Sequence, residues 1–468
     1  MTTFDLLVIG SGPAGQKAAI QAAKAGRRVL VIERERAVGG ACVHRGTIPS
    51  KTLRETAVAL VSMHRRLGGV VDLALPSDLQ IASLMTRMEA VVGAHERFLD
   101  DQLRRNGVTV WRGRARFTSP HALEVETPGE GRRCASAELI VLACGSRPRA
   151  PAGMPIDHHH ILDSDSILSM TYLPASLTVL GAGVIATEYA SIFAALGVEV
   201  TMIDRGPRPV AFVDPELSRT FVESFERGNG RFIADAKVAR IAYDGVGAVV
   251  TTLEDGTIVE SEKALVALGR IANIDGLDLE RAGLQANARG LIDVDAAGRT
   301  AVPHIYAAGD VVGPPSLASA SMEQGRRAAR HALGLSLGAA VETIPLGIYS
   351  IPEMSSVGAT EAETIAREGA AVVGRARFDE IARGQIAAIP DGMVKLVADA
   401  DGRKLRGVQI IGEGACELIH VGQMALLAGW EVDAFVENVF NFPTLAEAYR
   451  IAALDVVKER NRAGRSAA

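Results

Sequence analysis

The sequence has few of the residues that build disulfide frameworks, aromatic stacking surfaces or membrane spans. Its 468 residues include four cysteines, Cys42, Cys134, Cys144 and Cys416, too far apart to indicate a disulfide framework or a paired zinc site. Aromatic residues make up only 4%. Charge or glycine interrupts each apolar stretch well short of the roughly 18 to 20 residues that cross a bilayer. We therefore expect a cytoplasmic protein with no membrane partner and no metal site.

The sequence also lacks an excess of either charge. Fifty Lys and Arg stand against 55 Asp and Glu, a net charge of −5, and the two signs are interspersed. A nucleic-acid partner is therefore not expected. The N-terminus has no basic region and its apolar run ends at a glycine turn, which predicts a strand and no signal peptide. At about 150 residues per domain, the length indicates about three domains.

Glycine is abundant, at 48 residues, and it marks a local pattern that occurs twice. In the first copy, a strand over Phe4–Ile9 runs into a glycine-rich turn, a helix over 16–26 follows, and a strand over 28–32 ends at Glu33. This is a βαβ unit. Its helix N-terminus attracts the pyrophosphate of a dinucleotide, and the carboxylate at the end of the second strand accepts a ribose hydroxyl.

The second copy has a strand over Leu177–Leu180, a helix over 188–197 and a strand over Val198–Ile203 that ends at Asp204. Glu33 lies 18 residues after the third glycine position of its turn, and Asp204 lies 18 residues after the corresponding alanine. A single match is weak evidence for a ligand, but two complete copies predict that the chain binds two dinucleotides.

The order of elements predicts an α/β fold with two Rossmann-like domains and a C-terminal α+β domain. Prolines indicate a linker near 146–160, and a second break lies near 335–346. The last segment alternates strands at 394–398 and 408–411 with helices at 415–428 and 445–460. The expected segments are 1–150, 151–270, 271–340 and 345–468.

The sequence resembles the FAD-dependent pyridine nucleotide-disulfide oxidoreductase family, and within it the soluble, Si-specific NAD(P) transhydrogenases. The resemblance covers nearly the whole chain. It implies that 1–150 and 271–340 bind FAD, that 151–270 bind a nicotinamide nucleotide, and that 345–468 form the interface of a homodimer or larger oligomer. The motifs that carry it are GSGPAG at 10–15, VGGACVHRGTIPSK at 38–51, ACGSRP at 143–148, GAGVIATEYA at 181–190, HIYAAGD at 304–310, IYSIPEMSSVG at 348–358 and FNFPTLAEAYR at 440–450.

Two positions depart from the dithiol members of that family. Those members carry two cysteines separated by four residues, whereas this sequence has Cys42 followed by Thr47. A hydroxyl forms neither a disulfide nor a thiolate. They also place an acid/base histidine before a C-terminal proline and a glutamate beyond it, where this sequence has Phe442 and Glu447. Both departures imply that electrons do not leave the flavin through sulfur.

The function implied by the resemblance is ping-pong hydride transfer between NADPH and NAD⁺ through FAD. Lys51 and Glu188 match the Lys–Glu pair beside flavin N5, and Asp310 matches the residue that binds the ribityl chain. The segment from Glu33 to Cys42 would wrap the adenosine end. A helix that follows Ser319–Ser321 would point its N-terminus at the flavin pyrimidine.

Nucleotide choice depends on residues at the end of the second unit. Asp204 suits the free 2′-hydroxyl of NAD, whereas Arg205 and Arg208 offer donors to the 2′-phosphate of NADP, unless they are solvated loop charges. Catalytic roles fall to Lys51 and Glu188. The residues assigned to bind the two dinucleotides are Gly10, Gly12, Ala14, Gly15, Glu33, Arg34, Glu35, Arg36, Ala37, Val38, Gly39, Gly40, Ala41, Cys42, Lys51, Gly145, Asp310, Gly181, Gly183, Ala186, Asp204, Arg205, Arg208 and Gly269.

The sequence also permits other functions, and several residues outside the two turns have simpler structural roles. We expect His420 to be a core or interface residue, Cys42 a small packed residue, and Cys134, Cys144 and Cys416 structural residues. Thr47 and Phe442 argue against a disulfide reductase. A diaphorase or quinone reductase needs the same flavin and nucleotide sites, and a redox-sensing flavoprotein without turnover is the non-enzymatic alternative.

Overall fold

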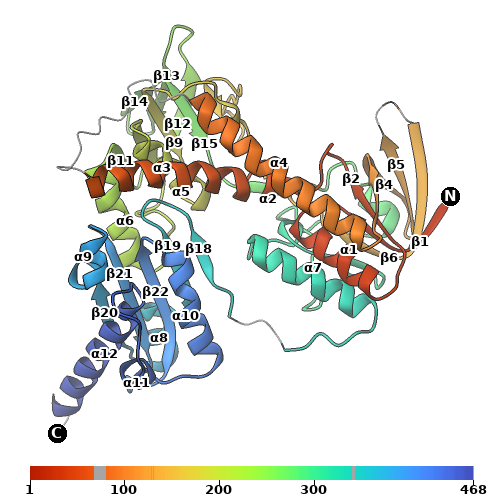
Figure 1. The fold of residues 1–468 in the computed structure, drawn as a ribbon. Coiled ribbons are helices and arrows are strands. Elements are labelled where there is room, and N and C mark those ends of the chain that lie inside the picture. The colour runs from red at the N-terminus through yellow and green to blue at the C-terminus, as the bar shows by residue number, and fades with distance from the viewer. Residues whose placement is uncertain (68–80, 128, 130, 340–342, 467–468) are drawn as a thin grey trace. The chain divides into compact units, whose positions relative to one another are not determined.

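The structure, a computed structural model, describes residues 1–67, 81–127, 129, 131–339 and 343–466 (Figure 1). Contacts divide the chain into two compact units. The first unit comprises Met1–Thr52, Ala82–Arg149 and Gly269–Ala340, and the second comprises Leu53–Ile81, Ala150–Leu268 and Val341–Ala468. No helix among the described residues combines the length and the apolar character that crossing a bilayer requires.

The first unit is built on a seven-stranded sheet in the order β3-β2-β1-β6-β5-β4, with β17 also paired to β6. β1 is parallel to β2 and to β6, and it is buried along most of its length. The continuous apolar run Leu6–Ile9 explains this, because a central parallel strand is covered on both faces. The strands are β1 (Thr2–Ile9), β2 (Val29–Glu33), β3 (Thr109–Arg112), β4 (Arg114–Ser119), β5 (Ala122–Thr127), β6 (Gly131–Leu142) and β17 (Ile305–Ala307).

Two helices of the first unit pack closely enough to require a glycine (Figure 1). A Cβ on Gly325 of α7 would lie 2.0 Å from the carbonyl oxygen of Ala14 on α1. α7 begins at Ala318, so Ser319–Ser321 belong to its first turn instead of preceding the helix, which corrects the expected boundary. The helices are α1 (Pro13–Lys24), α2 (Gly40–His44), α4 (Ile81–Arg105) and α7 (Ala318–Ala332), together with the start of α3 (Thr47–Leu67).

Part of the expected proline linker is a strand. β7 (Ser146–Pro148) pairs antiparallel with β16 (Arg270–Ala272) within the first unit. Pro148 lies at the end of a short two-stranded edge, where a missing backbone N–H is tolerated.

The second unit contains the second βαβ arrangement. Its parallel sheet has the order β11-β10-β9-β15-β8, with α5 (Val184–Ala195) between β9 and β10 and α6 (Pro215–Arg227) between β10 and β11. A three-stranded antiparallel sheet precedes β15. The strands are β8 (Ile161–Leu162), β9 (Ser176–Leu180), β10 (Glu199–Ile203), β11 (Gly230–Ile233), β12 (Val238–Tyr243), β13 (Val249–Leu253), β14 (Ile258–Ser261) and β15 (Lys263–Val266).

The C-terminal part of the second unit is a five-stranded antiparallel sheet with helices, so the predicted α+β character is confirmed. A Cβ on Gly374 of β20 would lie 2.1 Å from the carbonyl oxygen of Ala452 on α12, which shows how closely that helix covers the sheet. The elements are β18 (Leu346–Ile348), β19 (Met354–Gly358), α8 (Glu361–Glu368), β20 (Val372–Arg377), α9 (Ala382–Ile386), β21 (Gly392–Ala398), β22 (Leu405–Gly412), α10 (Ala415–Leu427), α11 (Asp433–Glu437) and α12 (Glu447–Ser466).

Candidate functional site

The three glycines of the first turn, Gly10, Gly12 and Gly15, have different surroundings, so the lack of a side chain matters for a different reason at each. Gly10 has a φ of +100°, and a Cβ there would lie 2.3 Å from the carbonyl oxygen of Ala143. A Cβ on Gly15 would lie 1.9 Å from the carbonyl oxygen of Gly10, so α1 approaches the turn closely. Gly12, at the N-terminus of α1, has no atom within 4 Å on that side. The turn is tight where strand and helix meet and open at the N-terminus of α1, the position at which such turns can accept a pyrophosphate.

Glu33 ends β2 beside this turn. The carboxylate is buried and accepts hydrogen bonds from the backbone N–H (2.9 Å) and the hydroxyl (2.5 Å) of Ser11, and from the N–H of Glu35 (2.9 Å). The hydroxyl of Ser11 also accepts from the N–H of Gly39 at 3.0 Å. A carboxylate has about four acceptor positions, so Glu33 retains capacity for a ribose hydroxyl.

The segment after Glu33 returns to the glycine turn. A Cβ on Gly40 would lie 2.8 Å from the Cα of Gly12, and Gly39 has a φ of +122°. Arg34 and Arg36 are exposed, and Glu35 lies 3.4 Å from Arg34. The structure therefore places Gly39 and Gly40 against the turn, while the predicted contacts of Arg34, Arg36, Ala37, Val38 and Ala41 with a ligand remain predictions.

Thr47, Lys51 and Asp310 of the first unit all lie close enough to Cys42 to affect its thiol. Burial raises the pKa of the Cys42 thiol, and the charge of Asp310 raises it further, whereas a hydrogen bond with Thr47 and the charge of Lys51 lower it. Cys42 is half-buried and is a free thiol. Lys51 lies on α3, where its ammonium donates to the hydroxyl of Ser50 at 3.4 Å.

Asp310 is held by residues that the sequence did not single out. The hydroxyl of Ser146 donates to its carboxylate at 2.6 Å, and Arg270 donates to the hydroxyl and the carbonyl oxygen of Ser146, both at 2.8 Å. Ser146 follows Gly145 and Arg270 follows Gly269, two predicted positions with open space and positive φ. The register of β7 against β16 brings them together, and no local pattern encodes that pairing.

The second glycine turn repeats the first. A Cβ on Gly181, at φ +105°, would lie 2.7 Å from the carbonyl oxygen of Ala267, and Gly183 at the start of α5 has no atom within 4 Å on that side. Ala186 stands at the third position and is fully buried. The second turn is therefore also open at its helix N-terminus.

Asp204 follows β10, the second strand of the second βαβ arrangement, just as Glu33 ends β2, the second strand of the first. Its carboxylate accepts from the N–H of Ala182 at 3.0 Å and from the N–H of Gly206 at 2.7 Å. The N–H of Val210 donates to the carbonyl oxygen of Ala182 at 2.7 Å. The loop of residues 205–213, here called the recognition loop, is thus folded back onto the glycine turn.

The two arginines predicted to bind a 2′-phosphate have different surroundings. Arg208 donates to the carbonyl oxygens of Val213 (2.9 Å) and Ala211 (2.5 Å) and to the hydroxyl of Ser218 (3.0 Å). Arg205, next to Asp204, is exposed. Arg208 shapes the recognition loop, and Arg205 has its guanidinium at the surface.

Glu188 lies buried on α5, and its carboxylate accepts from the backbone N–H of Tyr349 at 2.9 Å. This contact lies wholly in the second unit and joins α5 to the start of the C-terminal sheet. Lys51 belongs to the first unit, so its predicted pairing with Glu188 beside a flavin remains a prediction.

The remaining predicted positions have these environments. Phe442 is exposed before Pro443, and Glu447 accepts from the N–H of Thr444 at 3.3 Å. His420 is exposed and bonded to Gln423, so a core placement is wrong, whereas the alternative of an interface residue stays a prediction. Burial raises the pKa of Cys144 to about 12 and also raises the pKa of Cys416, whereas Cys134 is exposed.

The chain is similar in sequence to a family of proteins that is named for pyridine nucleotides. Residues 4–325 match the model of the pyridine nucleotide-disulphide oxidoreductases, and residues 344–453 match the dimerisation domain of the same proteins. A soluble pyridine nucleotide transhydrogenase of Mycobacterium bovis (strain BCG / Pasteur 1173P2) is 43% identical over 98% of both chains. One of Hahella chejuensis is 41% identical over 97% of this chain and 98% of its own.

Solved structures extend the comparison to the fold. LpdA from Mycobacterium tuberculosis superposes with a TM-score of 0.88 at 27% identity, covering 97% of this chain and 99% of that one. A Cu(II) complex of RclA, an HOCl-induced flavoprotein disulfide reductase of Escherichia coli, gives 0.87 at 26% identity over the same shares. The chain belongs to the pyridine nucleotide-disulphide oxidoreductase family.

Proposed function

We propose that the protein is an FAD-dependent pyridine nucleotide transhydrogenase that moves hydride between NADPH and NAD⁺ in a ping-pong reaction. The observation that carries the proposal is the pairing of two open glycine turns, each with its strand-end carboxylate, in a chain whose second thiol position holds Thr47. Similarity over nearly the full length to proteins named soluble pyridine nucleotide transhydrogenases supports it.

The first unit fits FAD. The open side of Gly12 leaves backbone N–H groups at the start of α1 facing free space, which suits a pyrophosphate. Glu33 retains acceptor capacity for a ribose hydroxyl, and Asp310, oriented by Ser146, suits a ribityl hydroxyl. FAD supplies, when bound, a ring that accepts a hydride from one nicotinamide and returns it to another.

Charged side chains of the chain would adjust that chemistry. In this proposal the ammonium of Lys51 offers positive charge where negative charge accumulates on reduction, and the carboxylate of Glu188 offsets the cost of burying it. Thr47 and Phe442 neither exchange a disulfide nor carry a titratable proton at neutral pH, so hydride transfer needs no thiol partner.

The second unit would hold the nicotinamide nucleotides in turn. The N-terminus of α5 at Gly183 faces the pyrophosphate, and Asp204 accepts the ribose hydroxyl of NAD. Arg205, exposed beside Asp204, offers donors to the 2′-phosphate of NADP. One pocket thereby admits both nucleotides.

Domain organisation and assembly follow the same proposal. The unit boundaries at 149/150 and 268/269 support an FAD domain in two segments, and the separate family match of 344–453 supports an interface domain distinct from the nicotinamide-nucleotide domain. The match of 344–453 to a dimerisation domain supports a homodimer. The expected location is the reducing cytoplasm, which suits four free cysteines.

An anaerobic two-step reaction tests the function. The FAD-loaded protein is mixed with one equivalent of NADPH, and a thio-NAD⁺ analogue, whose reduced form absorbs at its own wavelength, is added next. We expect flavin bleaching followed by recovery with stoichiometric analogue reduction. Flavin that bleaches and recovers only with a quinone would establish a diaphorase, and flavin that never bleaches would end the proposal.

A further inference from the structure

A buried lysine of the C-terminal sheet holds the start of α6. The ammonium of Lys395 on β21 lies 2.9 Å from Asp214, 2.7 Å from Glu361 and 3.3 Å from Glu216. The side chains of Lys395 and Asp214 are only 3% and 2% exposed. Lys395 therefore neutralises all three carboxylates, and since charges in so dry a place are screened little, its pair with Asp214 is the strongest of these contacts.

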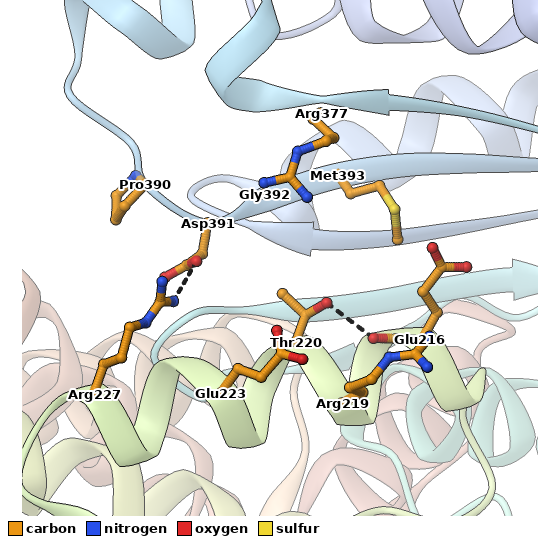
Figure 2. A pocket seen from close by; sticks show the side chains of 10 residues that line it. All are labelled: Glu216, Arg219, Thr220, Glu223, Arg227, Arg377, Pro390, Asp391, Gly392 and Met393. Atoms are coloured by element: carbon orange, nitrogen blue, oxygen red, sulfur yellow. Dashed lines mark hydrogen bonds and ion pairs between the residues drawn. The ribbon is translucent and has the colours of Figure 1, made fainter.

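A second cation and a second ion pair fix α6 to the same sheet. Arg375 on β20 donates to both carboxylate oxygens of Glu216, at 2.8 and 3.0 Å. At the other end of α6, Arg227 is paired with Asp391 beside β21, as Figure 2 shows. The helix is therefore held along its length by the C-terminal sheet.

The ion pairs between α6 and the sheet differ in how far they are exposed to solvent. A cavity of about 240 Å³ lies between them and is lined by Glu216, Arg227 and Asp391, so the ion pairs of these residues border a space that water can enter (Figure 2). It is lined by Glu216, Arg219, Thr220, Glu223, Arg227, Arg377, Pro390, Asp391, Gly392 and Met393. Because exposed ion pairs contribute little, the buried contact between Lys395 and Asp214 is the one that positions the helix.

Asp214 connects that lysine to the recognition loop. Its side chain caps α6 by accepting from the N–H of Glu216 at 2.9 Å. One turn later, the hydroxyl of Ser218 donates to the carbonyl oxygen of Pro209 at 2.8 Å and accepts from Arg208 at 3.0 Å. The first turns of α6 are thus the support on which residues 208–213 rest.

The loop in turn depends on that support. Val210 is buried with a φ of +42°, a conformation that β-branched residues rarely adopt. Such a conformation persists only when its surroundings hold it. The N–H of Val210 donates to the carbonyl oxygen of Ala182 in the second glycine turn, and the N–H of Ala182 donates to the carboxylate of Asp204. A shift of α6 would therefore move groups that frame the nucleotide site.

We propose that Lys395, in the C-terminal domain, is a positioning residue for the nicotinamide-nucleotide site and sets its affinity through Asp214, Ser218 and the recognition loop. The inference rests on the proposed function. Without the ammonium, Arg375 still neutralises Glu216 and Glu361, but the buried carboxylate of Asp214 loses its ion pair and is repelled by both, so the N-terminal turn of α6 moves away from β21. Affinity then falls for both nucleotides, because the displaced loop frames the shared ribose position and not the phosphate alone.

The test compares three variants of the FAD-loaded protein by calorimetric titration with NADP⁺ and with NAD⁺. Lys395→Met keeps the length of the side chain without its charge and should raise both dissociation constants about tenfold or more. Lys395→Arg keeps the charge and should recover most of the affinity. Lys458→Met, on an exposed pair with Asp455 in the same domain, is the control and should bind like the wild type.

Steady-state kinetics gives the second readout. For Lys395→Met, KM should rise with the dissociation constant while kcat at saturating nucleotide changes less than twofold. Unchanged dissociation constants in a folded, FAD-loaded Lys395→Met protein would overturn the inference. If that variant does not fold, Asp214→Ser, which retains a capping oxygen but not the carboxylate, must show the same loss. A wild type that binds neither nucleotide would instead defeat the proposed function.

Discussion

Thr47 lies close enough to Cys42 for its hydroxyl to lower the pKa of the thiol, against the rise that burial causes. Dithiol members of the family would have a second cysteine at the position of Thr47, so this contact occupies the place of a disulfide. The pKa of the Cys42 thiol is raised mainly by burial, which keeps the thiol protonated at neutral pH and makes it a poor nucleophile. Cys42 and Thr47 therefore do not form a dithiol.

Anaerobic dithionite titration should show uptake of about two electrons per bound FAD, because Cys42 has no thiol partner at position 47. Thr47→Cys should raise the uptake to about four electrons. It should nevertheless leave lipoamide and glutathione reduction undetectable, since Phe442 supplies no acid/base. Uptake of four electrons by the wild type, or appreciable disulfide reductase activity in Thr47→Cys, would contradict this account.

Lys51→Met should slow flavin reduction by NADPH at least tenfold in stopped-flow measurements, because the positive charge that favours the reduced ring is lost. FAD content should stay at the wild-type level, since the pyrophosphate and ribose contacts lie elsewhere. Lys24→Met, at the exposed end of α1, is the matched control. Equal reduction rates in the two variants would remove Lys51 from the catalytic assignment.

The local parts of this architecture were predictable and its long-range contacts were not. The strand, glycine turn and helix of each βαβ unit follow from periodicity and steric demands within about 30 residues. β1 and β9 appear close to where they are expected, whereas α1 and α5 begin three and four residues earlier, inside the glycine turns. The predicted linker conceals β7, because its partner β16 lies more than 120 residues away. Hydrophobic pattern contains no information about such a pairing.

The same limit applies to the site residues. Glu33 and Asp204 were identifiable because a strand-end carboxylate at a fixed spacing has a local signature. Ser146 and Arg270, which hold Asp310, have none. Lys395 reads as an ordinary strand residue, yet folding places it among carboxylates that lie far from it in sequence.

Glu188→Ala should lower the free energy of unfolding by about 1–3 kcal/mol, since it leaves the N–H of Tyr349 without this acceptor in a buried place. Glu188→Gln retains an oxygen at the same position and should lose less than half of that. Chemical denaturation monitored by tryptophan fluorescence and by flavin release checks both. Equal stability of the Ala and Gln variants would show that the acceptor does not matter.

The exposed loop before α12 should form part of a dimer interface. Val439 and Phe442 are 92% and 74% exposed and lie three residues apart in the segment that matches a dimerisation domain, and neighbouring exposed apolar side chains, unlike single ones, are typical of surfaces that a partner covers. Light scattering should give about twice the chain mass of 49.2 kDa. Phe442→Asp should shift that mass toward the monomer, whereas Val246→Asp, at a site 90% exposed in the β12–β13 turn, should not. A monomeric wild type would refute the homodimer.

The last prediction separates the two arginines after Asp204. Arg205→Ala should raise KM for NADPH about 10- to 100-fold and change KM for NADH less than twofold. The physical reason is the loss of charge-assisted hydrogen bonds to the 2′-phosphate, each contributing about 1.5–3 kcal/mol, with about 1.4 kcal/mol for each factor of ten. Arg205→Lys should show an intermediate effect, because an ammonium keeps the charge without the planar fork.

Arg208→Ala should affect both nucleotides alike. Its guanidinium donates to Ala211, Val213 and Ser218, so its removal loosens the recognition loop whatever nucleotide is bound. KM for NADPH and for NADH should rise together, and the thermal midpoint should fall. A phosphate-selective defect in Arg208→Ala with none in Arg205→Ala would reverse the assignment. Equal effects of both variants on both nucleotides would leave neither arginine as the reader of the 2′-phosphate, and selectivity would then have to come from Asp204 alone.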